Sequence, residues 1–515
     1  MQFRSIILAA LICFCVVFVG CSASSSSSEP SAPSSEPSIQ TDSETEAEPD
    51  TLKIGFSKLD GFNPYLVNDE LVLQTSGLVN EKLVEITPEM NVEYRIASSI
   101  TSNGLSAVIT LREDAMFADG TPITAQDVLA SFNAARSFVT YAGSLAHVTD
   151  AQIQGNQIVV TLSRPDSLFS YLCAIPILKQ SDISSPHPTP SGQYTYGSDN
   201  TLIKNPTSLF QEEHAPDTIQ LVDISNFDAL VSGLSVGSID LYATTKESIT
   251  TSAYTSRSTS FNMNHLVFLG VNSASSAFLG QAGIRNAIST ALDREILCER
   301  AYYGAALPAR GAIHPLYSCV TGKQTISTLS NLSKCEEQME ALGYKRSAAD
   351  GYYRDAAGQR PQIRLLVYSD SALKRSAATL IKEQLNDAGF MVNLEETEDF
   401  VGVYSDKIAK GDFDLYIGEL KLYNNMDMSP FFEKGAASFG IVQSPELLTA
   451  YSAFTANSDG AEAFETIFAQ QLPWIPLCWR SGTLVVNKQV TGMIPSCSNI
   501  FYSMQSSLPT SQPQA

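Results

Sequence analysis

The chain has little positive charge, and this argues against nucleic acid as a partner. Lys and Arg number 32 against 54 Asp and Glu in 515 residues, which gives a formal net charge of −22. Binding to nucleic-acid phosphates needs a basic surface, which this composition does not provide. The acidic balance is otherwise a statement about solubility. We therefore expect no nucleic-acid partner.

The motifs of common metal and phosphate sites are also missing. The five histidines have no metal-ligand spacing, no CxxC pair occurs, and no phosphate-binding loop is found. Two short strings match penicillin-recognising serine enzymes, namely SxxK from Ser371 to Lys374 and SDN at 198–200. Here SDN precedes SxxK, KTG is absent, and Lys374 is expected on a helix surface. We expect no enzyme, no cofactor and no metal site, with a serine hydrolase as an alternative.

The amino terminus has the pattern of a targeting segment. Residues 6–19 are entirely apolar. This run is too short for a comfortable membrane span of about 20 residues, but it fits the apolar part of a signal peptide at 1–20. Phe18 to Cys21 resembles the lipobox of bacterial lipoproteins, in which Cys21 becomes lipidated, although Leu is commoner at the position of Phe18. An uncleaved anchor or an ordinary signal cut after Gly20 is the alternative.

A polar segment follows this leader. Residues 21–50 hold seven acids, no base and almost no apolar side chains. Such a segment cannot bury enough apolar surface to offset the entropy of ordering, so we expect a disordered tether. A strand-like run then starts the folded body near Thr51. A lipid-anchored tether would hold the body at the outer face of the bacterial cytoplasmic membrane.

Cysteine pairing in the body stays open. An extracytoplasmic compartment permits disulfides, but a body of this size does not need them. Cys319 and Cys335 are the closest pair in sequence and hence a candidate bridge. The cysteines beyond residue 50 are Cys173, Cys298, Cys319, Cys335, Cys478 and Cys497.

One stretch, 107–136, combines a strand, a turn and a helix start. Apolar residues alternate over 107–111 in a run rich in β-branched side chains, which predicts a strand. Asp and Gly before Pro122 predict a turn. Thr124, with Asp127 three residues later, is typical of a capping box at a helix start.

The same stretch resembles the signature of a known family. The pattern LRxxxxFxDGTPxTAxDVxxSF at 111–132 closely resembles the family 5 extracellular solute-binding proteins, the dipeptide, oligopeptide and nickel receptors of ABC importers. Further family-like segments are IRNAISTALDREIL at 284–297, GSIDL at 237–241 and GDFDL at 411–415. The resemblance runs from about Thr51 to Gly492.

The family resemblance implies a two-lobed fold. Alternating strands and helices already predict an α/β class with mixed sheets. The resemblance adds a periplasmic-binding-protein-like fold of the large type II, with two crossover strands and a ligand enclosed by hinge closure. We expect lobe I at 51–262 plus 480–506 and lobe II at 263–479.

Periodicity predicts individual elements of the body. Helices are expected at 71–83, 283–300, 334–342 and 377–388, the last two closed by Gly343 and Gly389. Strands are expected at 153–162, with a Gly-Asn turn inside it, and at 266–271, 391–396 and 413–418. We expect Asp293 and Arg294 to form an ion pair on or between helices.

The ligand site is expected at the carboxyl end of strand 413–418, where open α/β sheets bind ligands. Peptide-binding members of the family tend to have GWxaDYxDP next, with an acid that holds the ligand ammonium. This chain has Glu419 in place of the Trp and Leu422 in place of the acid. The anchor is thus lost or has moved to Glu419 or Asp427. Alternatively, Glu419 and Lys421 share a face and neutralise each other.

Candidate ligand contacts come from an early loop, from the stretch after this strand, and from a second, Pro-containing strand. Phe62 and Trp479 have core packing as the alternative to stacking on a ligand. Arg480 is expected either to clamp a carboxylate bidentately or to form an ordinary salt bridge. The candidates are Phe62, Tyr65, Glu419, Lys421, Tyr423, Asn424, Asp427, Trp479 and Arg480.

The resemblance therefore implies a monomeric solute receptor that does no chemistry. It would capture a small ligand, with peptide as the first hypothesis, and deliver it to the membrane subunits of an ABC permease. A metal chelate, an oligosaccharide or a signalling peptide are the alternative ligands. A surface adhesin on a lipid tether is the alternative from another class.

Overall fold

The computed structural model describes residues 51–57, 61–224, 226–247, 256–433, 435 and 437–504. The predicted signal peptide and tether, including Cys21, lie outside the described residues. Contacts divide the chain into residues 1–48 and 49–515, and the second unit contains all the described hydrophobic clusters. Among the described helices, none is long and apolar enough to span a membrane.

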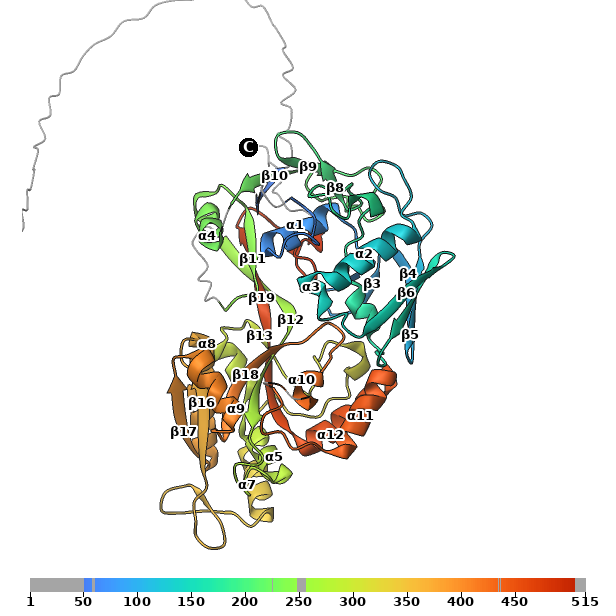
Figure 1. The fold of residues 1–515 in the computed structure, drawn as a ribbon. Helices are drawn as coiled ribbons and strands as arrows, with labels where there is room; N and C mark the ends of the chain where they lie inside the picture. The colour runs from blue at the N-terminus through green and yellow to red at the C-terminus, as the bar shows by residue number, and fades with distance from the viewer. Residues whose placement is uncertain are drawn as a thin grey trace, which may run out of the picture. The chain divides into compact units, whose positions relative to one another are not determined.

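A large mixed sheet is the main element of this unit (Figure 1). Its strands, in spatial order, are β17 (Met391–Thr397), β16 (Gln362–Tyr368), β18 (Leu415–Lys421), β12 (Ser256–Val271), β19 (Trp474–Asn487), β11 (Leu241–Thr244), β1 (Thr51–Phe56), β10 (Thr218–Asp223), β9 (Thr201–Lys204) and β8 (Tyr194–Tyr196), while β13 (Ala306–Pro308) pairs with β19.

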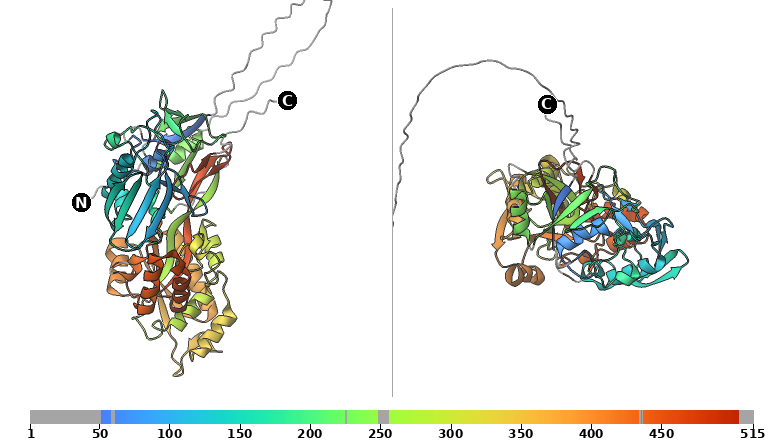
Figure 2. Two further views of the ribbon diagram at one scale, coloured as in Figure 1. Left: turned by 90° about the vertical axis from the view of Figure 1, so that its right-hand side faces the viewer. Right: turned by 90° about the horizontal axis from the view of Figure 1, so that it is seen from above.

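The remaining strands form smaller sheets. An antiparallel sheet contains β4 (Ala97–Asn103), β5 (Ser106–Leu111), β7 (Gln157–Leu162) and β6 (Val148–Gln154), seen in blue and teal in the left view of Figure 2. Three pairs are β2 (Val84–Ile86) with β3 (Val92–Tyr94), β14 (Lys345–Arg346) with β15 (Tyr353–Arg354), and β20 (Met493–Ile494) with β21 (Ser503–Met504).

Helices pack beside these sheets. Within the described residues they are α1 (Glu70–Val79), α2 (Ala125–Ser137), α3 (Val139–Ala142), α4 (Phe227–Val236), α5 (Ala282–Ala291), α6 (Arg294–Ile296), α7 (Leu332–Ala341), α8 (Ala372–Ala388), α9 (Ser405–Lys410), α10 (Ser429–Phe432), α11 (Pro445–Ala456) and α12 (Ala461–Gln471).

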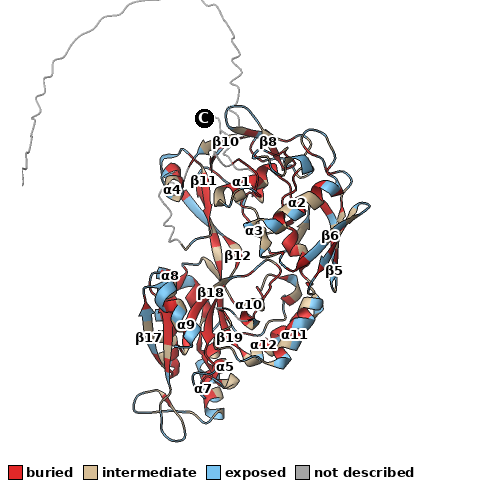
Figure 3. Ribbon diagram, viewed as in Figure 1, coloured by how far each residue is buried: buried red, intermediate tan, exposed pale blue. Residues whose placement is uncertain are grey.

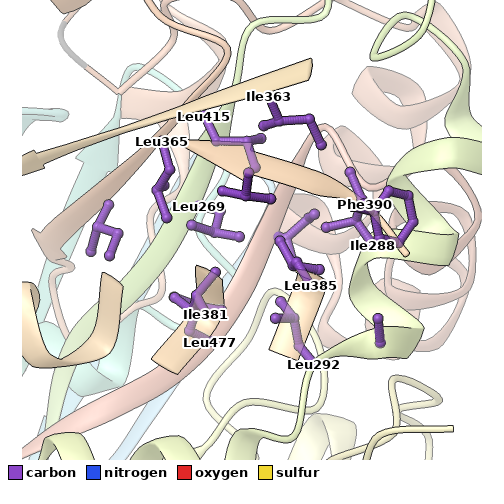
Figure 4. Close-up of a cluster of buried hydrophobic side chains, with 14 of the residues drawn as sticks. Leu269, Ile288, Leu292, Ile363, Leu365, Ile381, Leu385, Phe390, Leu415 and Leu477 are labelled. Atoms are coloured by element: carbon purple, nitrogen blue, oxygen red, sulfur yellow. The ribbon is translucent and has the colours of Figure 1, made fainter. Parts of the chain in front are cut away.

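In the core around β16 and β18, buried side chains of the strands pack against the apolar face of a helix. Leu365 and Leu415 are buried on the sheet, and Ile381 and Leu385, four residues apart on α8, are buried against the same cluster (Figure 4). Burial continues along the carboxyl end of β12 and the start of β18, which are red in Figure 3. Each such side chain contributes roughly 1.5–3 kcal/mol by leaving water.

Several local predictions are confirmed. The Thr124 side chain accepts from the Asp127 N–H, and the Asp127 carboxylate accepts from the Thr124 N–H, so the predicted capping box starts α2. Gly389 closes α8 at φ 104° and Gly343 follows α7 at φ 84°, left-handed conformations that suit glycine. Strand 391–396 is the body of β17.

Several predicted elements have different bounds, since β12 begins at Ser256 and α8 at Ala372, and three others differ as follows. The helix predicted at 283–300 is interrupted after Ala291, and Asp293 starts a new turn by capping the N–H of Ile296. The helix predicted at 71–83 ends at Val79. The strand predicted at 153–162 is parts of two strands, β6 and β7, because its Gly-Asn pair forms a hairpin turn.

The predicted ion pair between Asp293 and Arg294 is wrong. Arg294 is fully buried and donates to the carbonyl oxygens of Ser289, Ser327 and Pro476. Asp293 instead caps the following turn. Of the five donors of this guanidinium, three donate to carbonyls of three segments and a fourth donates to the Ser289 hydroxyl. Arg294 therefore ties these segments together inside the protein.

Candidate functional site

A cavity of about 420 Å³ opens at the carboxyl end of β18. Parallel strands β16 and β18 end at the same edge, so the start of α8 and the end of β18 meet there. Charged or titratable side chains that line the cavity are His265, Lys374, Glu419, Lys421 and Arg480. Its aromatic lining consists of Phe268, Tyr368, Phe400, Tyr404, Tyr416 and Phe439.

Strand register explains why three of the polar side chains form a row. On β12, His265 is paired with Lys421 of β18 on one side and with Arg480 of β19 on the other. Directly paired residues of antiparallel strands point to the same face of a sheet. Glu419 lies two residues before Lys421 and therefore shares that face. The sheet thus gathers these groups from three strands.

Glu419 is held by two cations. Its Oε1 lies 2.7 Å from Nε of Arg480, and its Oε2 lies 2.8 Å from Nζ of Lys374. Burial alone would raise the pKa of Glu419, but the contact with His265 and the charges of Lys374 and Arg480 outweigh burial and hold that pKa well below its usual range. Glu419 is therefore a carboxylate throughout the physiological range.

Lys374 joins α8 to the segment after β11. Its ammonium contacts the carboxylate of Glu247 as well as that of Glu419. Burial lowers the pKa of Lys374, but the two carboxylates outweigh it and raise that pKa above its usual value. The hydroxyl of Ser371, the residue before α8, donates to Glu247 and accepts from the N–H of Lys374.

His265 and Arg480 complete the polar cluster. Nδ1 of His265 lies 3.0 Å from Nη2 of Arg480 and 3.2 Å from Oε1 of Glu419. That nitrogen can accept from the first or donate to the second, and a neutral ring can make either contact. Burial lowers the pKa of His265, which favours this neutral form. Arg480 also donates to the carbonyl of Thr245 at 2.7 Å.

Lys421 is different from the other cations. Its side chain is exposed, and no carboxylate within the described residues lies within salt-bridge distance of it. The predicted neutralisation of Glu419 by Lys421 is therefore wrong. Lys374 and Arg480, which come from distant parts of the chain, take that role.

The second predicted anchor, Asp427, lies in a closed setting. Arg164 contacts both of its oxygens, at 2.6 and 3.3 Å, and Tyr451 donates to Oδ1 at 3.1 Å. Burial would raise the pKa of Asp427, but the hydrogen bonds from Arg164 and the Ser429 N–H lower it. The adjoining space is about 10 Å³, no more than one water needs.

The other candidates from the same stretch contact protein groups. The Tyr423 hydroxyl lies where a side chain at Gly143 would stand, so this ring packs closely on that glycine. The Asn424 side-chain oxygen accepts from Asn264, and its carbonyl accepts from Tyr317 at 2.6 Å. Neither Tyr423 nor Asn424 lines the cavity at Glu419.

The remaining candidates lie in the core. Phe62 is buried and stacks on Phe56 at 4.5 Å between ring centroids. Tyr65 is buried, with its hydroxyl donating to the carbonyl of Pro176. Trp479 is 1% exposed and lies 4.9 Å from the ring of His314. Of the nine candidates, the structure brings Glu419, Lys421 and Arg480 together.

The serine motifs lie at a helix start, in a turn and at a helix end. Ser371 is the N-cap of α8, and Asp199 and Asn200 adopt positive φ in the turn between β8 and β9. A GxSxG string at 233–237 contains Ser235, but it forms the end of α4 rather than a strand-to-helix elbow. The sequence assigned no catalytic role to any of them.

Neither a disulfide nor a metal-binding group of side chains is found among the described residues. The six cysteines of the body are free, so the candidate bridge between Cys319 and Cys335 is not formed. Among the described residues, no group of three His, Cys, Asp or Glu side chains could hold a metal ion.

Three members of the polar cluster were absent from the sequence-based candidates: Glu247, His265 and Lys374. Lys374 had a usable signal, because it follows the carboxyl end of strand β16, a neighbour of β18. His265 directly precedes the strand predicted at 266–271. Glu247 had no signal, since no motif surrounds it and its partner is more than a hundred residues away.

Comparisons with known proteins give a consistent result. The sequence profile described as "Bacterial extracellular solute-binding proteins, family 5 Middle" matches residues 91–440. The oligopeptide-binding protein OppA of Bacillus subtilis (strain 168) is 22% identical over 498 residues, covering 85% of this chain and 89% of OppA.

Solved structures are similar over almost the whole body. A nickel ABC transporter structure from Bacillus halodurans has a TM-score of 0.72 at 17% identity, covering 88% of this chain and 98% of that one. The periplasmic murein tripeptide-binding protein MppA, in its unliganded open form, has a TM-score of 0.69 at 16% identity, covering 87% and 95%. The predicted two-lobed α/β fold class is thereby confirmed, while the lobe boundaries stay predictions.

Proposed function

This chain belongs to the family 5 bacterial extracellular solute-binding proteins, and from that membership we propose that it captures a small ligand at Glu419, Lys421 and Arg480 and delivers it to an ABC permease. Members of this family are substrate-binding proteins of ABC importers and work outside the cytoplasm. The finer statements, on ligand, anchor and partner, are our proposal.

The observation that carries the proposal is the cavity at the end of β18. Its volume, about 420 Å³, is in the range of small-molecule sites, which run from roughly 300 to 1,000 Å³. It combines aromatic walls with a few charged groups on neighbouring strands, the composition that such sites use for affinity and orientation. It also lies at the strand end where ligands of open α/β sheets bind.

Peptide is our first hypothesis for the ligand class. The Bacillus subtilis relative is named for oligopeptides, whereas the Bacillus halodurans structure is named for nickel. A cavity that offers both charges and aromatic rings suits a peptide, which has charged ends and apolar side chains. A metal chelate is the alternative, in which the metal would arrive with its own ligands.

The leader supports a lipid anchor. We propose that Cys21 is lipidated and that residues 22–50 tether the receptor body to the outer face of the membrane, where it meets the permease as a monomer. Labelling cells with a fatty-acid probe tests this. A Cys21→Ala variant should lose the label and appear in the medium, whereas release of the unchanged chain would contradict anchoring.

Native mass spectrometry of residues 49–515, purified without refolding, tests the capture of a ligand. An added mass that is lost on denaturation and fragments as a peptide supports the proposal. A metal-bearing or sugar mass would replace the peptide and keep the receptor. Absence of any added mass, together with no thermal shift over a broad ligand panel, would contradict capture. We expect the ligand to be released chemically unchanged.

A further inference from the structure

Within the described residues, one cation of the cavity has no carboxylate partner after the other charges are paired. Glu419 lies between Lys374 and Arg480, and Glu247 contacts Lys374 from the other side. These two carboxylates balance the two buried cations. Lys421 lines the same cavity, and no carboxylate of the described residues lies within salt-bridge distance of it. The cavity therefore presents one uncompensated positive charge to a ligand.

The pairing also makes Glu419 a poor receptor for an ammonium group. Both of its oxygens already accept from cations, at 2.7 and 2.8 Å. A ligand ammonium that approached Glu419 would come close to Lys374 and Arg480, and like charges repel strongly in a partly buried site. Arg480 is occupied too, with bonds to Glu419 and to the carbonyl of Thr245.

Part of the cavity lining is aromatic. Phe400 lies 5.2 Å from Tyr368 and 5.6 Å from Tyr404 between ring centroids, so the three rings form one surface. Phe400 is 51% exposed although it is a large apolar side chain. Burial of this ring against an apolar group would be favourable, and aromatic pairs gain further from their geometry.

We propose that the cavity selects an anionic ligand with an apolar group, which places its carboxylate at Lys421 and its apolar group on the ring of Phe400. This inference rests on the proposed function, since it names the chemical class that the same site takes. If the ligand is a peptide, the receptor recognises its carboxyl end rather than its amino end.

Two probes of similar size and opposite charge test the sign of this preference. Acetyl-Ala-Phe has a free carboxylate and no ammonium, whereas Ala-Phe-amide has an ammonium and no carboxylate. Calorimetry on residues 49–515 should give a dissociation constant at least about tenfold lower for acetyl-Ala-Phe. Equal or tighter binding of Ala-Phe-amide would overturn the inference and leave the receptor function standing.

Charge reversal of Lys421 separates a direct contact from a general effect. The Lys421→Glu variant should bind Ala-Phe-amide in preference to acetyl-Ala-Phe, a reversal that misfolding cannot produce. Lys345→Glu is the matched control, because Lys345 is exposed on β14 and does not line the cavity, and it should keep the original preference. An unchanged preference in Lys421→Glu would overturn the inference.

The remaining outcome is that neither probe binds, which overturns the inference for ligands of this size. A co-purified ligand detected by native mass spectrometry would then still support the receptor. Without any such ligand, the proposed function fails as well.

Discussion

Glu419, which is half-buried, and Asp427, which is buried, both face an arginine and have a lowered pKa, yet their surroundings differ. Glu419 borders a cavity of about 420 Å³, whereas the space at Asp427 is about 10 Å³. The cluster at Glu419 includes a neighbouring cation, Lys421, without a carboxylate partner among the described residues. Protein groups use both oxygens of Asp427, as they do at Glu419, but within the described part of the chain no cation at Asp427 is left without a partner beside open space.

An ion-paired carboxylate can therefore either hold two segments together or form part of a binding cavity. At Asp427 the pair with Arg164 joins segments 263 residues apart and leaves no room for a ligand. At Glu419 the ion pairs hold the cations in place beside open space, so the cluster is a preorganised wall of the cavity. Two features distinguish the proposed binding site from the structural ion pair: the free volume beside it and a cation without a carboxylate partner among the described residues.

The largest effect is expected for Glu419→Ala. This change leaves the buried Arg480 without its carboxylate partner, while Lys374 keeps Glu247, and breaking a buried pair in this way costs roughly 3–5 kcal/mol of unfolding free energy. Urea unfolding of residues 49–515 measures it. Glu396→Ala, an exposed glutamate on β17, is the control and should cost less than about 0.5 kcal/mol. A loss below about 1 kcal/mol for Glu419→Ala would contradict the pairing.

A smaller loss is expected for Asp427→Ala, because Arg164 is 41% exposed at its side chain and water can solvate it. The buried Tyr451 hydroxyl and the Ser429 N–H lose their acceptor, which costs roughly 1–3 kcal/mol. The affinity for acetyl-Ala-Phe should stay unchanged, as calorimetry will measure. A tenfold loss of affinity would instead make Asp427 part of the site.

Low pH should reduce the contribution of Glu419 to the free energy of unfolding. Its pKa in the folded protein lies below the ordinary value of 4.5, so its ion pairs contribute fully above that value and lose their contribution as the pH falls below it. Comparing wild type with Glu419→Gln by urea unfolding, we expect their stability difference to shrink by about 1 kcal/mol from pH 7 to about pH 3.5. A difference that stays constant or grows would contradict a lowered pKa.

The smallest effect is expected for Phe400→Ala and concerns binding. Loss of an aromatic contact should weaken acetyl-Ala-Phe by about two- to tenfold, with little change in stability because the ring is half exposed. Val236→Ala, an exposed apolar residue of α4, is the control. Equal weakening of acetyl-Ala-Ala by Phe400→Ala would show that the aromatic contact is not what is lost.

Local features of the fold were predictable because short-range chemistry decides them. The capping box at Thr124, the glycine after α8 and the strand at 391–396 each depend on residues within a few positions of one another. The break after Ala291 was missed because apolar periodicity continues through it while Asp293 caps a new turn. The family resemblance supplied the two-lobed architecture, which periodicity alone does not give.

The site was predictable in part. Glu419, Lys421 and Arg480 follow from the rule that ligands bind at strand ends, together with the family pattern. Their pairing did not follow, because Lys374 and Arg480 reach Glu419 from segments more than forty residues away on either side. Sequence spacing suggested the nearest cation, Lys421, whereas the folded sheet and α8 supply two others.

We propose that a ligand is captured at Lys421, beside Glu419, rather than at Asp427. Native mass spectra of three proteins test it most directly: residues 49–515 of the wild type, of Lys421→Glu and of Asp427→Asn, each purified without refolding. We predict an added mass in the wild type and in Asp427→Asn that is lost in Lys421→Glu. An added mass that persists in Lys421→Glu and disappears in Asp427→Asn would contradict the account.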